Sequence, residues 1–197
     1  GFPTPEPVIS TAVSELLDGK TKYTRGQGSP ALCEAVAHHL MKTSKISVSP
    51  ENVVITPGAK QALLYSYMTV LNPSDEAILL SPSWASYEPM ISIIGGVPVN
   101  VPVDRKNFHP DMDAIRSSIT DRTRMIMVNS PCNPTGAVYT REEIEEIVSI
   151  AIEHDLWIIS DEIYSRLIWN GGEHVSPATI EGGKERTIVI SGWSKTW

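Results

Sequence analysis

The chain has 197 residues, 41% of them hydrophobic and 20% charged, which is the composition of an ordinary globular protein. Its formal net charge of −7 argues against nucleic acid as the main partner, because a phosphate backbone is bound by a basic face. We expect no membrane segment and no signal peptide, since no apolar run approaches the roughly 20 residues of a span. Cys33 and Cys132 lie far apart without metal-ligand spacing, which favours free thiols in a reducing compartment, either cytoplasmic or the matrix of an organelle.

The first part of the chain is predicted to lie outside the main domain. Residues 1–29 contain several prolines and glycines, and we expect an N-terminal arm and linker with one short helix at residues 7–17. A second helix is predicted at residues 30–41, because Pro30 is favoured in a first helical turn and apolar residues recur on one face after it. This helix would begin the main domain, residues 30–197.

Strand and helix patterns alternate along the rest of the chain. Strands are predicted at residues 52–56, 76–80, 97–101, 124–128, 156–159 and 187–190. Helices are predicted at residues 60–71, 83–94, 111–118 and 140–154, the last with a capping box of Thr140 and Glu143. The strands are mostly continuous apolar runs, which indicates burial on both faces. The predicted fold class is therefore α/β, a three-layer α/β/α arrangement with a mostly parallel sheet.

Three patterns that suggest other chemistry lack the context that they need. Residues 26–31 (GQGSPA) match a loose dinucleotide-binding fingerprint, but polar residues precede them where a strand is required. The pair Gly183-Lys184 lacks the following Ser or Thr, and the earlier glycine, of a phosphate-binding loop. The five histidines show no metal-ligand spacing, so no metal site is predicted.

Several predicted strands run into loops that carry polar side chains or glycine. Such loops lie at the carboxyl edge of an α/β sheet, where these folds bind their ligands. Lys195 follows the last predicted strand, although a lysine in this position is more commonly only solvated. Gly58 separates another strand from a helix, and its turn is either an ordinary helix start or an anion site formed by free N–H groups. Trp84 follows the next strand and either packs in the core or lies over a planar ring.

Two further strand ends add candidates for the same site. Residues 129–136 (NSPCNPTG) form a loop stiffened by two prolines, in which Asn133 could donate its amide to a phenolate oxygen. Asp161 ends a buried strand, where an unpaired carboxylate is costly. It either caps the following helix or pairs with a cation such as a pyridinium N–H, and Tyr164 could reach the oxygen of the same ring.

Together these motifs resemble the pyridoxal-phosphate aminotransferases of fold type I, in particular the aspartate aminotransferase family. The similarity is greatest to the bacterial and plant branch that includes aspartate/prephenate aminotransferases. The matching motifs occur in family order across nearly the whole chain, at residues 22–23 (KY), 56–63 (TPGAKQAL), 81–84 (SPSW), 129–131 (NSP), 133–136 (NPTG), 160–164 (SDEIY) and 194–195 (SK).

The resemblance implies pyridoxal 5'-phosphate as the cofactor, bound to Lys195 as a Schiff base. Lys195 would then also move the Cα proton of the substrate. Asp161 would pair with the pyridine nitrogen, Tyr164 and Asn133 would bind the ring oxygen, and Trp84 would stack on the ring.

The resemblance also implies residues that bind phosphate and substrate. The turn of Gly58, Ala59 and Lys60 would hold the phosphate, Ser194 would belong to the same cofactor site, and Tyr23 would reach the phosphate of a neighbouring subunit in a homodimer. Trp84 and Asn133 would contact the substrate as well. The Lys60 side chain would bind the distal carboxylate of an acidic amino acid of the aspartate or glutamate type.

The implied activity is transfer of an amino group between an amino acid and a 2-oxo acid. The same fold and cofactor set also serves carbon–sulfur lyases, cyclopropane-carboxylate synthases and decarboxylases. A non-catalytic domain that senses the cofactor is a further alternative.

The sequence departs from the family at two points. Gly192 stands where some members carry a serine that binds phosphate. The family also continues for about as long again after its lysine. We therefore expect residues 30–197 to be a truncated cofactor-binding large domain without the C-terminal small domain, and we expect this piece alone to be inactive or nearly so.

Overall fold

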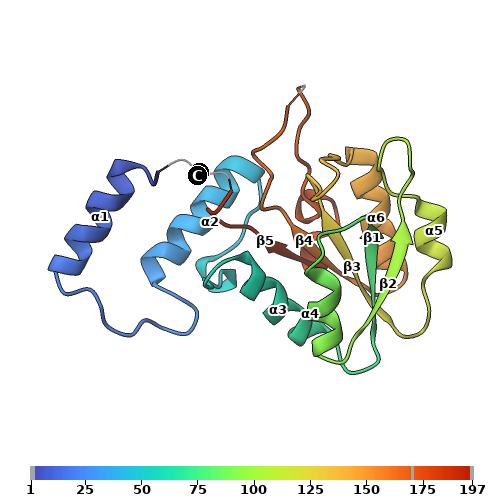
Figure 1. Ribbon diagram of the computed structural model, residues 1–197, viewed down its shortest axis with the longest axis horizontal. Coiled ribbons are helices and arrows are strands. Elements are labelled where there is room, and N and C mark those ends of the chain that lie inside the picture. The colour runs from blue at the N-terminus through green and yellow to red at the C-terminus, as the bar shows by residue number, and fades with distance from the viewer. Residues whose placement is uncertain (1–2, 170, 196–197) are drawn as a thin grey trace.

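The computed structural model describes residues 3–169 and 171–195. The outermost residues of the expected arm and large domain, 1–2 and 196–197, lie outside this description. A parallel sheet with helices on both faces forms the body, and α1 (Glu6–Leu17) stands apart from it (Figure 1). No helix in the described ranges combines the length and apolar character needed to cross a bilayer.

The sheet has five strands, all parallel to their neighbours. They are β1 (Glu76–Ser81), β2 (Val97–Pro102), β3 (Thr123–Asn129), β4 (Trp157–Asp161) and β5 (Thr187–Ile190), in the spatial order β2-β1-β3-β4-β5. The chain moves from β1 to β2 in one direction, then returns to β3 on the other side of β1 and continues to β5. This reversal makes the boundary between β1 and β3 a topological switch point, where loops leave toward opposite faces.

Helices cover both faces of the sheet. α3 (Ala59–Val70) and α4 (Tyr87–Ile93) lie on one face, while α5 (Met112–Ser117) and α6 (Arg141–Glu153) lie on the other (Figure 1). Consecutive residues of β1 serve the two sides in turn: Leu79 packs in the cluster of Leu63, and Leu80 packs in the cluster of Ile147. The pleat of a buried strand produces this alternation, and the predicted three-layer α/β/α class is confirmed.

The predicted capping box at the start of α6 is also confirmed. Thr140 Oγ1 accepts a hydrogen bond from the Glu143 N–H (3.3 Å), and Glu143 Oε2 accepts one from the Thr140 N–H (2.7 Å). Two other helices differ from their predicted bounds by more than one residue. α2 runs farther, over Pro30–Ser44, and α4 begins at Tyr87, because residues 82–86 form the turn that leaves β1.

The strand predicted at residues 52–56 is wrong. This segment follows a 3₁₀ turn, η1 (Pro50–Asn52), and is extended but lies outside the sheet. Val53 packs against Cys33 and Ala37 of α2, so its apolar character reflects burial against a helix. Gln27 holds the segment in place, since its carbonyl accepts from the Ile55 N–H (2.8 Å) and its Nε2 donates to the Val53 carbonyl (2.8 Å).

The residues that resembled a dinucleotide fingerprint therefore have a structural role. Gly28 has a φ of +115°, and a Cβ built on it would lie 2.7 Å from Ile55 Cγ1. Glycine is needed there because the two backbone segments approach closely and the left-handed region disfavours side chains. Two more 3₁₀ turns, η2 (Pro177–Thr179) and η3 (Lys184–Arg186), precede β5.

The amino edge of the sheet contains a buried carboxylate with a full set of donors. Glu76 Oε1 accepts from Arg122 Nη2 (2.7 Å), and Oε2 accepts from Thr120 Oγ1 (2.6 Å) and Thr123 Oγ1 (3.2 Å). The hydrogen bonds from Thr120 and Arg122 hold the pKa of Glu76 below its usual value. These contacts join the start of β1 to the turn before β3.

Candidate active site

The carboxyl ends of the central strands lie side by side. The register pairs Asn129 of β3 with Asp161 of β4, and Asp161 with Ile190 of β5. The loops that follow these strands therefore begin at one edge of the sheet, and the loop after β1 joins them across the switch point. This edge is the usual place for ligands in open α/β sheets.

Asp161 provides a buried negative charge at this edge. The residue is 4% exposed; its Oδ2 accepts from the Tyr87 hydroxyl (2.7 Å) and its Oδ1 from the Ile163 N–H (3.2 Å). Burial raises the pKa of Asp161, the two hydrogen bonds lower it, and the charge of Glu162 raises it. None of the ion pairs found among the described residues involves Asp161. The predicted helix cap is not what this carboxylate forms, because a turn and not a helix follows β4.

Tyr87 connects Asp161 to the aromatic part of the site, and the sequence analysis missed it. Its ring meets Trp84 edge-on, with centroids 5.3 Å apart and planes at 84°. Lys60 Nζ lies 5.2 Å from the centroid of the Trp84 ring, within range of a cation–π contact. Four side chains from three separate segments thus form a row from Lys60 to Asp161. Burial raises the pKa of Tyr87, and the Asp161 charge raises it further, so its hydroxyl remains a donor.

Asn129 links the loop after β3 to the end of β4. Its Nδ2 donates to the Asp161 carbonyl (2.9 Å), and its Oδ1 accepts from the Asn133 N–H (2.8 Å). The half-buried Asn133 is thereby fixed close to the Asp161 backbone. These two hydrogen bonds of the Asn129 amide hold the loop in addition to its prolines, and the motif alone did not reveal them.

The N-terminus of α3 is the part of the edge suited to an anion. Gly58 is the N-cap with a φ of +90°, and no side chain caps the helix. No hydrogen bond found among the described residues uses the N–H groups of Ala59 or Lys60. Free N–H groups at the positive end of a helix attract anions.

The remaining predicted residues are less tightly connected to this row. Ser194 and Lys195 are exposed in the turn after β5, which leads from Ile190 beside the end of β4. Tyr164 is partly buried in the turn that follows Asp161. Tyr23 lies in the arm and is fully exposed, so this chain does not bring it to the row.

Other parts of the described surface offer less. An open depression of about 440 Å³ lies near the amino edge beside Thr120, Arg124 and His154, and one of about 240 Å³ lies between Arg25 and Cys33. Neither includes a residue of the row. No group of three or more His, Cys, Asp or Glu side chains in the described ranges could hold a metal ion.

The carboxyl edge therefore combines a buried carboxylate, an aromatic face, free N–H groups and a lysine on the adjoining turn, in a doubly wound parallel sheet. The model of the family "Aminotransferase class I and II" matches residues 2–197, and the chain belongs to this family.

Particular relatives agree with this assignment. The aspartate/prephenate aminotransferase of Thermus thermophilus is 43% identical over 197 residues, which cover all of this chain and 50% of the relative. A structure of aspartate aminotransferase from Thermus thermophilus with maleate has a TM-score of 0.94 at 44% identity, covering 98% of this chain and 50% of that one. The aromatic aminotransferase from Pyrococcus horikoshii OT3 has a TM-score of 0.96 at 38% identity, covering 99% and 52%. The chain spans about half the length of the curated relatives that it matches.

Proposed function

We propose that the protein to which this chain belongs is a transaminase that uses pyridoxal 5'-phosphate. The observation that carries the proposal is Asp161, a buried carboxylate at the ligand-binding edge that forms no ion pair among the described residues. A protonated pyridine nitrogen is a cation of the right kind for this position. Such a pairing keeps the ring protonated, and the bound cofactor then supplies an electron sink for the substrate's Cα electrons.

The neighbouring groups fit the rest of that cofactor. The N–H groups of Ala59 and Lys60, in the turn that Gly58 makes possible, would bind the phosphate. Trp84 would cover the ring, and its orientation would be held by Tyr87 through their edge-on contact.

The ring oxygen and the reactive amine complete the assignment. Asn133 and Tyr164, on the loops after β3 and β4, would donate to the ring oxygen. Lys195 would hold the cofactor's aldehyde carbon through its Nζ, with Ser194 beside it. Once the substrate's amine had displaced Nζ from that carbon, the freed Nζ would take a proton from the substrate Cα and deliver it to the former aldehyde carbon, since one amine can serve as nucleophile and base.

The substrate class follows from Lys60. Its exposed ammonium lies over Trp84 at the end of the row opposite Asp161, where it could bind a second carboxylate. The Thermus thermophilus structure was solved with maleate, a dicarboxylate, which supports an acidic amino acid and its 2-oxo acid as substrates. A solved structure with a TM-score of 0.96 is an aromatic aminotransferase, so comparing activity with aspartate and with an aromatic amino acid tests this assignment.

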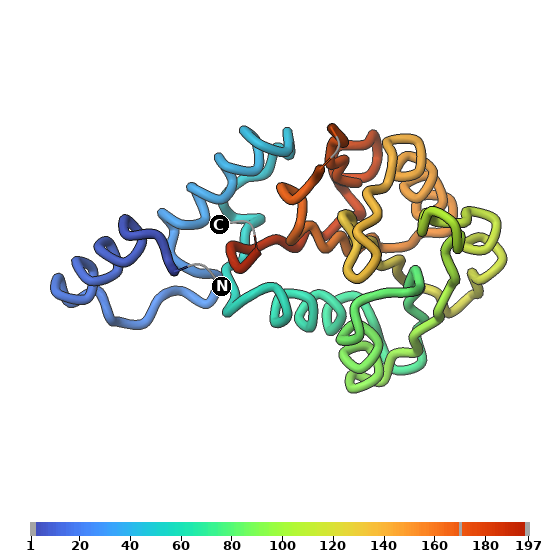
Figure 2. The backbone as a smooth tube through the Cα atoms, turned by 45° about the horizontal axis from the view of Figure 1, so that its top comes forward, coloured from blue at the N-terminus to red at the C-terminus, as the bar shows by residue number. Residues whose placement is uncertain are grey.

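The arm supports a homodimer with shared sites. α1 has no buried residue, and Val8, Val13, Leu16 and Leu17 are 49–83% exposed. Figure 2 shows this helix held away from the body by an extended connection. An apolar helix in this position fits the surface of a second copy, in which Tyr23 would reach the neighbouring phosphate.

The test is to add pyridoxal phosphate, reduce with borohydride and map the modified peptide. We expect the label on Lys195, its loss in Lys195→Ala, and its retention in the control Lys184→Ala, which removes a lysine of η3. A label on another lysine contradicts the proposal. Transfer of an amino group to 2-oxoglutarate by the whole protein separates a transaminase from a lyase or a cofactor sensor, because only the transaminase forms glutamate.

A further inference from the structure

A second buried carboxylate follows Asp161 directly but points to the other side of β4. Glu162 is 2% exposed. Its Oε1 accepts from Ser160 Oγ (3.0 Å) and Ser176 Oγ (2.6 Å), and its Oε2 lies 2.9 Å from His174 Nε2. Every side-chain oxygen of this carboxylate therefore has a hydrogen-bond partner, as is usual for a buried polar group.

His174 has an unusual environment for a buried histidine. Its side chain is 9% exposed, and its Nδ1 is buried without a hydrogen-bond partner among the described residues. A buried polar atom left unpaired is unfavourable. The contact of Nε2 with Glu162 is the hydrogen bond that holds the ring at this place.

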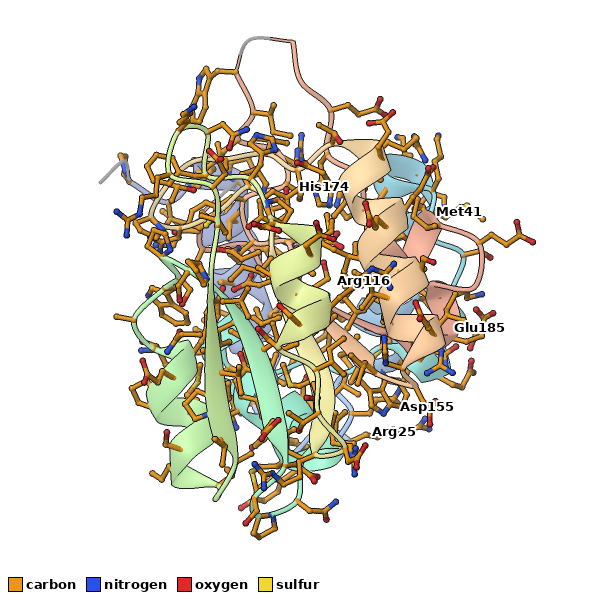
Figure 3. The ribbon with its side chains drawn as sticks, turned by 90° about the vertical axis from the view of Figure 1, so that its right-hand side faces the viewer. Arg25, Met41, Arg116, Asp155, His174 and Glu185 are labelled. Atoms are coloured by element: carbon orange, nitrogen blue, oxygen red, sulfur yellow. The ribbon has the colours of Figure 1, made fainter. Side chains whose placement is uncertain are left out.

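The backbone of Glu162 joins the segments that carry the candidate site. Its N–H donates to the Ile190 carbonyl at the end of β5 (2.8 Å), and its carbonyl accepts from the Ser165 N–H (2.9 Å). Its side chain binds His174, where the chain returns from the loop that projects from the body. Figure 3 labels His174 at the base of this projecting loop, which comprises residues 164–169 and 171–173 in the described ranges.

We propose that Glu162 and His174 form a positioning pair, which fixes the turn of Tyr164 and the start of the Lys195 segment relative to Asp161. The inference rests on the proposed function, because it concerns the same site. The two adjacent carboxylates at the end of β4 have different roles: Asp161, its last residue, lies in the row of site residues, and Glu162, just after the strand, joins the surrounding loops. The charge of Glu162 also reaches Asp161, since it raises the pKa of that carboxyl.

The substitutions His174→Phe and His174→Gln separate the effect of the hydrogen bond to Glu162 from the effect of side-chain size. Phenylalanine removes the donor to Glu162, while glutamine can restore it through its amide. In the cofactor-free chain we expect His174→Phe to speed hydrogen exchange at Ser165 and in the projecting loop, and His174→Gln to return most of the protection. In the whole protein we expect His174→Phe to weaken binding of pyridoxal phosphate about tenfold, the loss typical of a partner that orients a binding group. The pH midpoint of the bound cofactor's absorption band should also move.

The control is His109→Phe. His109 Nδ1 lies 2.8 Å from both carboxylate oxygens of Glu143, so the substitution breaks a similar pair at the start of α6. We expect it to lower the free energy of unfolding without moving the absorption midpoint. If His174→Phe changes neither the cofactor affinity, nor the pH midpoint of the absorption band, nor the hydrogen exchange of the loop, and Lys195 is still labelled, the positioning pair is overturned but the transaminase is not. A wild-type protein that binds no pyridoxal phosphate overturns both.

Discussion

A buried carboxylate lies at the start of β1 and another at the end of β4, and their hydrogen-bond partners differ in kind. At the amino edge, Glu76 binds the Arg122 guanidinium and the Thr120 hydroxyl, and its pKa is lowered. At the carboxyl edge, Asp161 binds the neutral Tyr87 hydroxyl, and burial raises its pKa. The first arrangement stabilises the fold, while the second keeps an anion at a place where a cation can bind.

This contrast predicts that Asp161→Asn stabilises the cofactor-free chain at neutral pH. A raised pKa in the folded state contributes stability below the ordinary value of 3.8, and this contribution is lost as the pH rises through the folded value. At pH 7 the ionised carboxylate is therefore unfavourable, and asparagine can still accept from Ile163 and donate to Tyr87. We expect a gain of about 1 kcal/mol in urea unfolding at pH 7, which disappears near pH 4, together with weaker cofactor binding.

Glu76→Gln is the matched control, and we expect it to change the free energy of unfolding in the opposite direction. Because the pKa of Glu76 is lowered, its contribution is present above the ordinary value of 4.5 and is lost as the pH falls through the folded value. We expect the substitution to cost about 2 kcal/mol at pH 7 and less in acid, without any effect on cofactor binding. If both substitutions changed the free energy of unfolding in the same direction at pH 7, this account of the two edges would be contradicted.

Among the elements, the extended segment after η1 is held by contacts with residues 27 and 28 and not by pairing in the sheet. Its Val53 and Ile55 are held by Gln27 and by the close approach of Gly28. We expect Gly28→Ala to destabilise the chain by about 2–3 kcal/mol, because the new Cβ would overlap Ile55 and the φ of +115° is strained for alanine. Gly26→Ala should be nearly neutral in the same chemical unfolding experiment, since nothing lies within 4 Å of its Cβ position. Equal losses for the two glycines would refute this explanation.

The elements that could be predicted are those whose pattern depends on local sequence. The five sheet strands were evident as apolar runs, and α6 was evident from its capping box. The segment at residues 52–56 was misread, because burial against α2 and burial in a sheet produce the same apolar pattern. Strand-end loops identified Asp161 and Asn133 as candidates, but the Tyr87 contact and the Glu162–His174 pair join residues 74 and 12 positions apart and could not be read from spacing.

For the whole molecule, the exposed helix α1 predicts how copies associate. Val13 and Leu16 lie on its apolar side and touch no core cluster of their own chain. We expect Leu16→Asp to weaken the dimer of the whole protein at least tenfold in sedimentation, while the unfolding free energy of the isolated chain stays within about 0.5 kcal/mol. Ser14→Asp adds the same charge to a polar position and should leave the dimer intact. A dimer that withstands Leu16→Asp would assign the contact to another surface.

The shared register of β3, β4 and β5 has a consequence for divergence within the family. Asn129, Asp161 and Ile190 occupy paired positions, so their backbones are spaced by the hydrogen-bonding interval of a sheet, about 4.8 Å per strand. Insertions or exchanges in the loops beyond these residues leave that interval unaltered. Loop tips can therefore be remodelled while the groups that we propose to contact the cofactor keep the spacing that the strands set.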